Sequence, residues 1–286
     1  MRVSNAMMAE NIKGYLFKHT EKLLKTQEQI ASTKRINRAS DDPIGLGLAM
    51  GYRKNIASIE QYNTNINNAK LHINTVEDIL GGVTDMLTEA KEIAADPAPN
   101  MRALLADQVV AIREQVLQMA NSKINGNYAF SGDLTDTPPF DAAGVYAGDT
   151  GTKDHIIGDG LQINITADGE QIFQGASDVF TVLTDLETAL NANDATTIAA
   201  QLPLLNDAIQ QLNTTRAVNA GQYKRLEATL SYNERFLVNV QDLLSRTEDT
   251  DIASAAIDLK IQETAYQSTL ATAAKIIQPS LIDFLD

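Results

Sequence analysis

A long apolar stripe between Leu48 and Ala94 constrains the fold of this chain more than any other feature. Alternating steps of four and three residues meet an apolar side chain at thirteen of fourteen positions, and Asn55 is the exception. A 3.5-residue repeat sustained for more than six heptads puts one narrow apolar face along a helix, as in a coiled coil or long-helix bundle. At about 1.5 Å per residue the helix is roughly 70 Å long. The chain is therefore expected to build something elongated.

A second stripe with the same rhythm runs from Leu205 to Leu244, with nine apolar places in twelve. Antiparallel pairing of the two long helices is the economical arrangement, so the two ends of the chain are expected to meet. A shorter amphipathic helix is predicted from Leu105 to Met119. Gly81 and Gly82 interrupt the polar side of the first stripe, and each costs about 1 kcal/mol against Ala in a helix. We therefore expect a bend there.

Helix-start chemistry stands just before the first long stripe, at Ser40-Asp41-Asp42-Pro43. Asp42 is a good N-cap residue, and Pro43 suits the first position of a helix. The paired aspartates also suit the positive end of a helix dipole. The sequence therefore predicts a joint at these four residues, with the long helix beginning at Pro43.

A weak stripe occupies residues 8–36, and a further stripe with eight apolar places in ten runs from residue 252 to residue 284. Burying a large apolar side chain contributes about 1.5–3 kcal/mol, whereas ordering the backbone costs about 1–2 kcal/mol per residue. We therefore expect both tails to be mobile in the free chain and to order only against other copies. The predicted assembly residues are Ile12, Leu16, Leu23, Ile30, Leu259, Tyr266, Leu270, Ile277, Leu281 and Phe284.

One polar residue, Glu263, falls on the predicted carboxyl-terminal stripe. Two explanations stay open at this point. Glu263 pairs with a basic residue of the amino-terminal tail, or the register of the stripe slips at this position.

Residues 131–175 have a different composition from the rest of the chain. Nine of the sixteen glycines lie between Gly126 and Gly175, and residues 161–166 alternate with period two, as in a half-buried strand. Asp168-Gly169 reads as a turn. With nine acids and one base between residues 131 and 178, this region is predicted to be a small, acidic, largely β insertion that faces solvent.

These patterns predict a mainly α fold: an elongated antiparallel long-helix bundle or coiled-coil rod with a small β-rich insertion domain. Three domains are expected. Terminal helices at 1–42 and 248–286 form an assembly domain, residues 43–130 and 176–247 form the long-helix domain, and 131–175 form the insertion.

Composition and motifs argue against catalysis, cofactor binding and metal binding. The net charge is −14, although residues 1–55 carry +5 and the remainder −19; nucleic acid is therefore not expected as the main partner. The chain has no cysteine, and its three histidines lie far apart in sequence. No phosphate loop, dinucleotide fingerprint or nucleophile elbow occurs. We expect no enzyme, no cofactor and no metal site.

The acidic group in the insertion is the best candidate for a cation site. Its spacing fits no calcium or zinc pattern, so it is interpreted as a solvated loop. Its members are Asp149, Asp154, His155, Asp159 and Asp168. The chain also shows neither a secretory signal peptide nor an apolar membrane span, which taken alone favours a cytoplasmic protein.

The joint, preceded by Lys34-Arg35-Ile36-Asn37, resembles the amino-terminal signature of the bacterial flagellin family. Residues 248–285 resemble the family's other terminus. The opening Met1-Arg2-Val3-Ser4 with Met7-Met8, and residues 127–132 followed by Pro139-Phe140, are more similar to the family's hook-associated members than to flagellin proper. The resemblance covers roughly residues 1–140 and 205–286.

This resemblance implies a fold in which the two terminal segments pair as the inner layer of a helical tube. It implies a structural adaptor, a ring of copies that joins the flagellar hook, through a neighbouring hook-associated protein, to the flagellin filament. A minor flagellin that forms the filament itself is the alternative.

The resemblance also implies an extracellular, flagellar location without a cleaved signal peptide. The chain would be transiently cytoplasmic and would leave the cell unfolded through the flagellar type III export apparatus. A cytosolic chaperone would shield the carboxyl-terminal helix before export.

Overall fold

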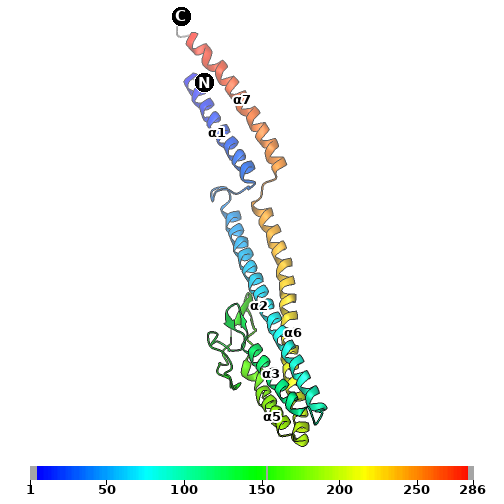
Figure 1. The fold of residues 1–286 in the computed structure, drawn as a ribbon. Coiled ribbons are helices and arrows are strands. Elements are labelled where there is room, and N and C mark those ends of the chain that lie inside the picture. The colour runs from blue at the N-terminus through cyan, green and yellow to red at the C-terminus, as the bar shows by residue number, and fades with distance from the viewer. Residues whose placement is uncertain (1–4, 153, 283–286) are drawn as a thin grey trace. The chain divides into compact units, whose positions relative to one another are not determined.

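The computed structural model describes the backbone of residues 5–152 and 154–282, with side chains for residues 7, 8, 10–152 and 154–274. The fold is mainly α, with small antiparallel strand pairs (Figure 1), which confirms the predicted fold class. The helices are α1 (Asn5–Ser32), α2 (Pro43–Ala95), α3 (Arg102–Ala120), α4 (Gly169–Phe173), α5 (Val179–Asn191), α6 (Ala195–Glu248) and α7 (Ile252–Ile282). The strands are β1 (Lys123–Ile124), β2 (Asn127–Tyr128), β3 (Asp154–Gly158) and β4 (Leu161–Asn164).

The chain divides into two compact units. One contains residues 1–57 with 236–286, and the other contains residues 58–235. The three-domain division drawn from the sequence stays a prediction.

The second unit, residues 58–235, is built on the two long stripes. The buried members of the α2 stripe are Ile59, Ile66, Ala69, Ile73, Val76, Leu80, Val83, Leu87, Ala90 and Ala94. Lys70 of α2 lies over the Tyr223 ring of α6 at 4.8 Å, and Glu77 pairs with Arg216 at 2.7 Å. Because the α2 partner rises in number while the α6 partner falls, these two helices run antiparallel, as the sequence predicted.

Helix α2 continues as one helix through Gly81 and Gly82, and the bend expected at these glycines stays a prediction. Gly82 instead faces α3, and a Cβ atom at this position would collide with the Met119 Cε. An alanine at this position would require the flexible end of the Met119 side chain to move.

The insertion is packed into the second unit more firmly than its composition suggested. Strands β3 and β4 pair antiparallel, and the Ile157 and Ile163 side chains are buried against a small core that includes Ile66 and Leu226 of the long helices. The strand predicted for residues 161–166 ends at Asn164. The expectation that the insertion simply faces solvent is wrong, because its alternate apolar side chains cover the helices.

Helix α4 was not predicted from the sequence. The Asp168 carboxylate accepts hydrogen bonds from the Glu170 and Gln171 amides and so caps a helix where a turn was expected. Phe173, at the end of α4, is fully buried, with its ring centroid 5.3 Å from those of Phe130 and Phe140. The aromatic cluster explains why the short helix is held in place.

In the first unit, α1 and α7 lie side by side (Figure 1). The α7 positions that are buried or half-buried are Ala255, Leu259, Gln262, Glu263, Ala265, Tyr266, Thr269 and Ala273. Thr26 on α1 is buried, and its Oγ1 donates a hydrogen bond to the Gln262 Oε1 at 3.2 Å. The contact face of α7 is therefore centred on Ala255, Gln262 and Ala273.

This contact face corrects two details of the sequence prediction. The predicted α7 stripe is confirmed only in part, because Leu259, Tyr266 and Ala273 are buried or half-buried whereas Ile252 and Leu270 are 51% and 43% exposed. Glu263 is half-buried and pairs with Lys260 of its own helix at 3.2 Å, rather than with a basic residue of the amino-terminal tail. At the start of α2, Leu48 is 51% exposed while Ala49 is buried, so the long stripe is also wrong at its first position.

Candidate assembly interface

Two connecting segments meet between the terminal helices and the long helices, within the first unit. The Arg35 amide donates to the Glu248 carbonyl oxygen at 2.6 Å, and the Thr250 amide donates to the Thr33 carbonyl oxygen at 2.9 Å. Lys34 and Asp249 form the antiparallel bridge between these bonds. The connectors after α1 and after α6 therefore hold each other as a very short ladder.

A buried carboxylate lies at the end of α6, beside this ladder. Glu248 is only 3% exposed, and it pairs with the Lys34 ammonium and with the Arg53 guanidinium, the latter at 2.6 Å. The Lys34 ammonium also contacts Asp249 at 2.8 Å. Hydrogen bonds to Asp249 and then to Glu248 raise the pKa of Lys34. The cluster ties α2, α6 and the connector after α1 together through charge.

The predicted joint residues have distinct roles next to this cluster. Asp41 accepts hydrogen bonds from the Asn37 and Arg38 amides and pairs with Lys25 at 2.8 Å. The Lys25 hydrogen bond, followed by that of the Arg38 amide, lowers the pKa of Asp41 to about 2. Ser40 is exposed, and Pro43 begins α2.

Asp42 caps the long helix. Its Oδ1 accepts a hydrogen bond from the Gly45 amide at 2.8 Å, and this bond is the main reason that the pKa of Asp42 is lowered. A Cβ atom at Gly45 would meet the Asp42 carboxylate and would lie 2.8 Å from the Ile36 Cδ1. Only glycine fits here without displacing the cap.

The predicted assembly residues are distributed between the inside and the outside of the α1 and α7 pair. The half-buried ones are Ile12, Leu16, Leu23, Ile30, Leu259 and Tyr266, whereas Leu270 is exposed. The side chains of Ile277 and Leu281, and all of Phe284, lie outside the described residues.

The helix pair also carries large apolar side chains that the sequence analysis missed. On α1, Phe17 and Leu24 are 67% and 58% exposed; on α7, Ile257 and Ile261 are 63% and 60% exposed. The two α1 residues are seven positions apart and the two α7 residues are four apart, so each pair lies on one face of its helix. We call these four residues the outer faces. Apolar residues spaced by four or seven outside the main stripe could have indicated these faces from the sequence.

The pair buries little of its own surface. Among the described side chains, Thr26 is the buried residue of α1, and Ala255 and Ala273 are those of α7. None of the three is a large apolar residue. The contact between the two helices therefore depends on half-buried side chains, which contribute less against the entropy of ordering than fully buried ones do.

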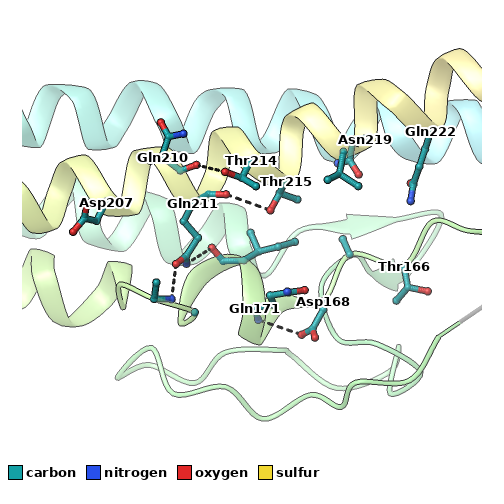
Figure 2. A pocket seen from close by; sticks show the side chains of 15 residues that line it. Thr166, Asp168, Gln171, Asp207, Gln210, Gln211, Thr214, Thr215, Asn219 and Gln222 are labelled. Atoms are coloured by element: carbon teal, nitrogen blue, oxygen red, sulfur yellow. Dashed lines mark hydrogen bonds between the residues drawn. The ribbon is translucent and has the colours of Figure 1, made fainter.

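A polar pocket of about 690 Å³ lies in the second unit, between α6 and the segment around α4. Figure 2 shows Gln211 reaching from α6 to this segment, where its Oε1 accepts from the Ala176 and Ser177 amides at 2.7 and 3.1 Å. Its Nε2 donates to the Ile172 and Ser177 carbonyl oxygens. All four contacts are to backbone groups, so Gln211 fastens the segment to α6.

Two members of the acidic group in the insertion bind nearby backbone amides. Asp149 accepts from the Asp133 and Gly151 amides, and Asp168 caps α4. Across the part of the chain that the structure describes, no three or more His, Asp or Glu side chains gather around a metal position. Within the same part, no helix has the length and apolar character needed to cross a bilayer.

Comparison with known proteins points to one family. The model for the bacterial flagellin N-terminal helical region matches residues 3–135. Flagellar hook-associated protein 3 of Salmonella typhimurium is 25% identical, covering 95% of this chain and 96% of that protein. The flagellar filament 33 kDa core protein of Treponema phagedenis is also 25% identical, over 89% of this chain and 88% of its own.

A solved structure has the same fold. The flagellar hook associated protein-3 of Legionella pneumophila superimposes with a TM-score of 0.62 at 16% identity, covering 68% of this chain and 97% of that one.

Proposed function

We propose that this chain, which is similar to members of the bacterial flagellin family over most of its length, is a structural subunit of the flagellum that joins the hook to the filament. It acts by assembly rather than by catalysis. Its partners are other copies of itself in a ring, a neighbouring hook-associated protein on one side and flagellin on the other.

One observation supports this proposal most directly: the sparsely buried α1 and α7 pair exposes Phe17, Leu24, Ile257 and Ile261. Large exposed apolar side chains that recur on one helix face are typical of protein interfaces. Neighbouring copies cover the outer faces and supply the burial that the pair lacks. The terminal helices, residues 1–42 and 248–286, act as the assembly domain and order as a copy joins the growing end.

The joint has a defined part in this assembly. The Glu248 cluster and the Asp42 cap set how α1 and α7 leave the long helices. Residues 43–130 and 176–247 form the long-helix domain, and residues 131–175 form the outer insertion. The predicted assembly residues on α1 and α7 are proposed to lie at contacts within and between copies.

The chain is proposed to reach the flagellum by the flagellar type III export apparatus, with a cytosolic chaperone on its carboxyl-terminal helix. Its location is then extracellular after a brief cytoplasmic stage. Both steps are consistent with terminal helices that bury little against each other in the free chain.

The first experiment removes residues 252–286. The truncated chain is expected to keep the second unit folded, since its core lies entirely within residues 58–235. In cells that lack the intact gene it should fail to join hook to filament. A truncated chain that still restored filaments would overturn the proposal.

A filament-forming flagellin is the second candidate, because a filament core protein is as similar as the hook-associated relative. Electron microscopy of the purified full-length chain at high concentration separates the two. A junction subunit is expected to form no long filaments alone, whereas a flagellin would polymerise without limit.

A further inference from the structure

The tight turn between β1 and β2 consists of Asn125 and Gly126. The two strands pair by two residues each, so these two residues make the whole connection. Their φ angles are 52° and 89°. Positive φ at both central residues is typical of a type I′ turn, in which Asn-Gly is a favoured pair. Both residues are exposed, so the turn lies open to water.

The two groups of this turn that can react with each other are unpaired. Within the described part of the chain, the Gly126 amide donates no hydrogen bond and the Asn125 carboxamide makes none. A Cβ atom built on Gly126 would meet nothing within 4 Å. The backbone nitrogen of Gly126 and the side-chain carbon of Asn125 are therefore free to approach each other.

Other asparagines in the second unit are held. The Asn121 Oδ1 accepts a hydrogen bond from the Phe140 amide at 3.0 Å, and its Nδ2 donates to the Phe140 carbonyl oxygen at 2.9 Å. Asn193 also has a positive φ, of 56°, but the Arg102 guanidinium donates to its Oδ1. Asn125 differs from both because its carboxamide is unrestrained and a glycine follows it.

We propose that Asn125-Gly126 is a site of spontaneous conversion of asparagine to aspartate and isoaspartate. The Gly126 nitrogen attacks the Asn125 Cγ, so that a new C–N bond forms and the bond from Cγ to the side-chain nitrogen breaks. That nitrogen leaves as ammonia and takes the amide proton with it, and a five-membered succinimide ring remains. Water opens the ring at either carbonyl carbon. The net change is loss of ammonia and gain of water.

The local fold permits this reaction. A two-stranded hairpin is marginal by itself in water, and β1 and β2 contribute only two residue pairs. Short exposed elements open at a small free-energy cost, which gives the turn access to the backbone angles that the attack requires. Glycine has no Cβ and adds no steric barrier at the attacking nitrogen.

The product changes the turn in two ways. Isoaspartate routes the main chain through Cβ, which lengthens the turn by one carbon atom, and the new carboxylate adds a negative charge. Just beyond the turn, the Tyr128 amide donates to the Thr135 carbonyl oxygen and the Ala129 amide donates to the Ser122 carbonyl oxygen, both at 3.0 Å. Conversion weakens these bonds and loosens the segment that follows β2.

Incubation of the full chain at pH 8, followed by trypsin digestion and mass spectrometry, tests the proposal. Trypsin cleaves after Lys123 and so separates Asn125 from Asn121. Asn125 is expected to convert at least about tenfold faster than Asn121 or Asn193, a ratio that corresponds to about 1.4 kcal/mol of activation free energy. Enzymatic methylation of isoaspartate identifies this product in the Asn125 peptide.

Ser122→Gly is the matched control, because it places a glycine after Asn121 while Phe140 still holds the Asn121 carboxamide. In this variant Asn121 should stay slow and Asn125 should keep its rate. Slow hydrogen exchange of the Ala129 amide verifies that the variant is folded; if it fails this check, the test rests on the native chain. The proposal is overturned if Asn125 converts no faster than Asn121 in the native chain, or if Asn121 of the folded variant converts as fast as Asn125.

Discussion

At the scale of single residues, Glu248 has the most consequential environment in the first unit. A carboxylate that is 3% exposed is costly unless it is paired, and here two cations from different segments pair with it. Lys34 follows α1 and Arg53 belongs to α2, so one buried charge determines the relative placement of three segments.

Replacing Glu248 with Gln should lower the free energy of unfolding by about 1–2 kcal/mol, because Arg53 loses its carboxylate partner and Lys34 keeps only Asp249, while solvent screens both partly exposed cations. This loss is measured by urea unfolding of the full chain, with hydrogen exchange of the α1 and α7 amides as the readout. Asp242→Asn is the control, since Asp242 forms an exposed pair with Arg246 four residues away. That change should cost less than about 0.5 kcal/mol. Equal effects of the two variants would contradict the role given to Glu248.

Gly45 and Gly47 offer a matched test of the cap. Gly45→Ala should destabilise the joint, because its Cβ would push the Asp42 carboxylate away from the α2 amides; loss of a cap costs about 1 kcal/mol. Gly47→Ala meets nothing within 4 Å and should stabilise the helix by up to about 1 kcal/mol. Thermal unfolding of the two variants should therefore shift in opposite directions, and shifts of the same sign would argue against the crowded cap.

At the scale of elements, the second unit is organised by side chains that connect segments distant in sequence. Gln211 of α6 binds four backbone groups between residues 172 and 177, and Asn65 of α2 binds the backbone of β3. The insertion therefore has little regular structure of its own but is anchored at several points on the long helices.

Gln211→Ala should lower the free energy of unfolding by about 2–3 kcal/mol, because it leaves half-buried backbone amides and carbonyls without partners. The hydrogen-exchange rates of the 172–177 amides should rise in the same variant. Gln210→Ala is the control, since Gln210 is exposed on the same helix turn. If Gln210→Ala had the same effect, the fastening role of Gln211 would be excluded.

At the scale of the whole molecule, the buried apolar core and the proposed assembly surface belong to different units. The large buried apolar cluster lies in residues 58–235, whereas the terminal helices bury Thr26, Ala255 and Ala273 among their described side chains. Substitutions on the outer faces should therefore affect assembly without affecting the folding of the free chain.

Phe17→Ser and Ile261→Ser should each leave the urea midpoint of the free chain within error, because both side chains are more than half exposed. Each should reduce incorporation into flagella at least tenfold, which corresponds to about 1.4 kcal/mol. Val145→Ser is the control, an equally exposed apolar site in the other unit. Normal incorporation of both terminal variants would show that the outer faces are not assembly contacts.

The sequence alone determined the long helices, the start of α2 at Pro43 and the meeting of the terminal segments. These features follow from local periodicity and capping, which depend only on residues close together in the sequence. The register of α7 could not be read in the same way, because Ile252, Ile257 and Ile261 spread apolar character around the whole helix.

Only the tertiary structure decided which distant residues meet. Glu248 pairs with Lys34 and Arg53, α4 is held by the burial of Phe173, and His72 and His155 line one pocket although 83 positions separate them in sequence. Such pairings depend on how elements pack rather than on residue spacing. A single sequence carries the periodicity of each element, but the contacts between elements arise only when their faces are brought together.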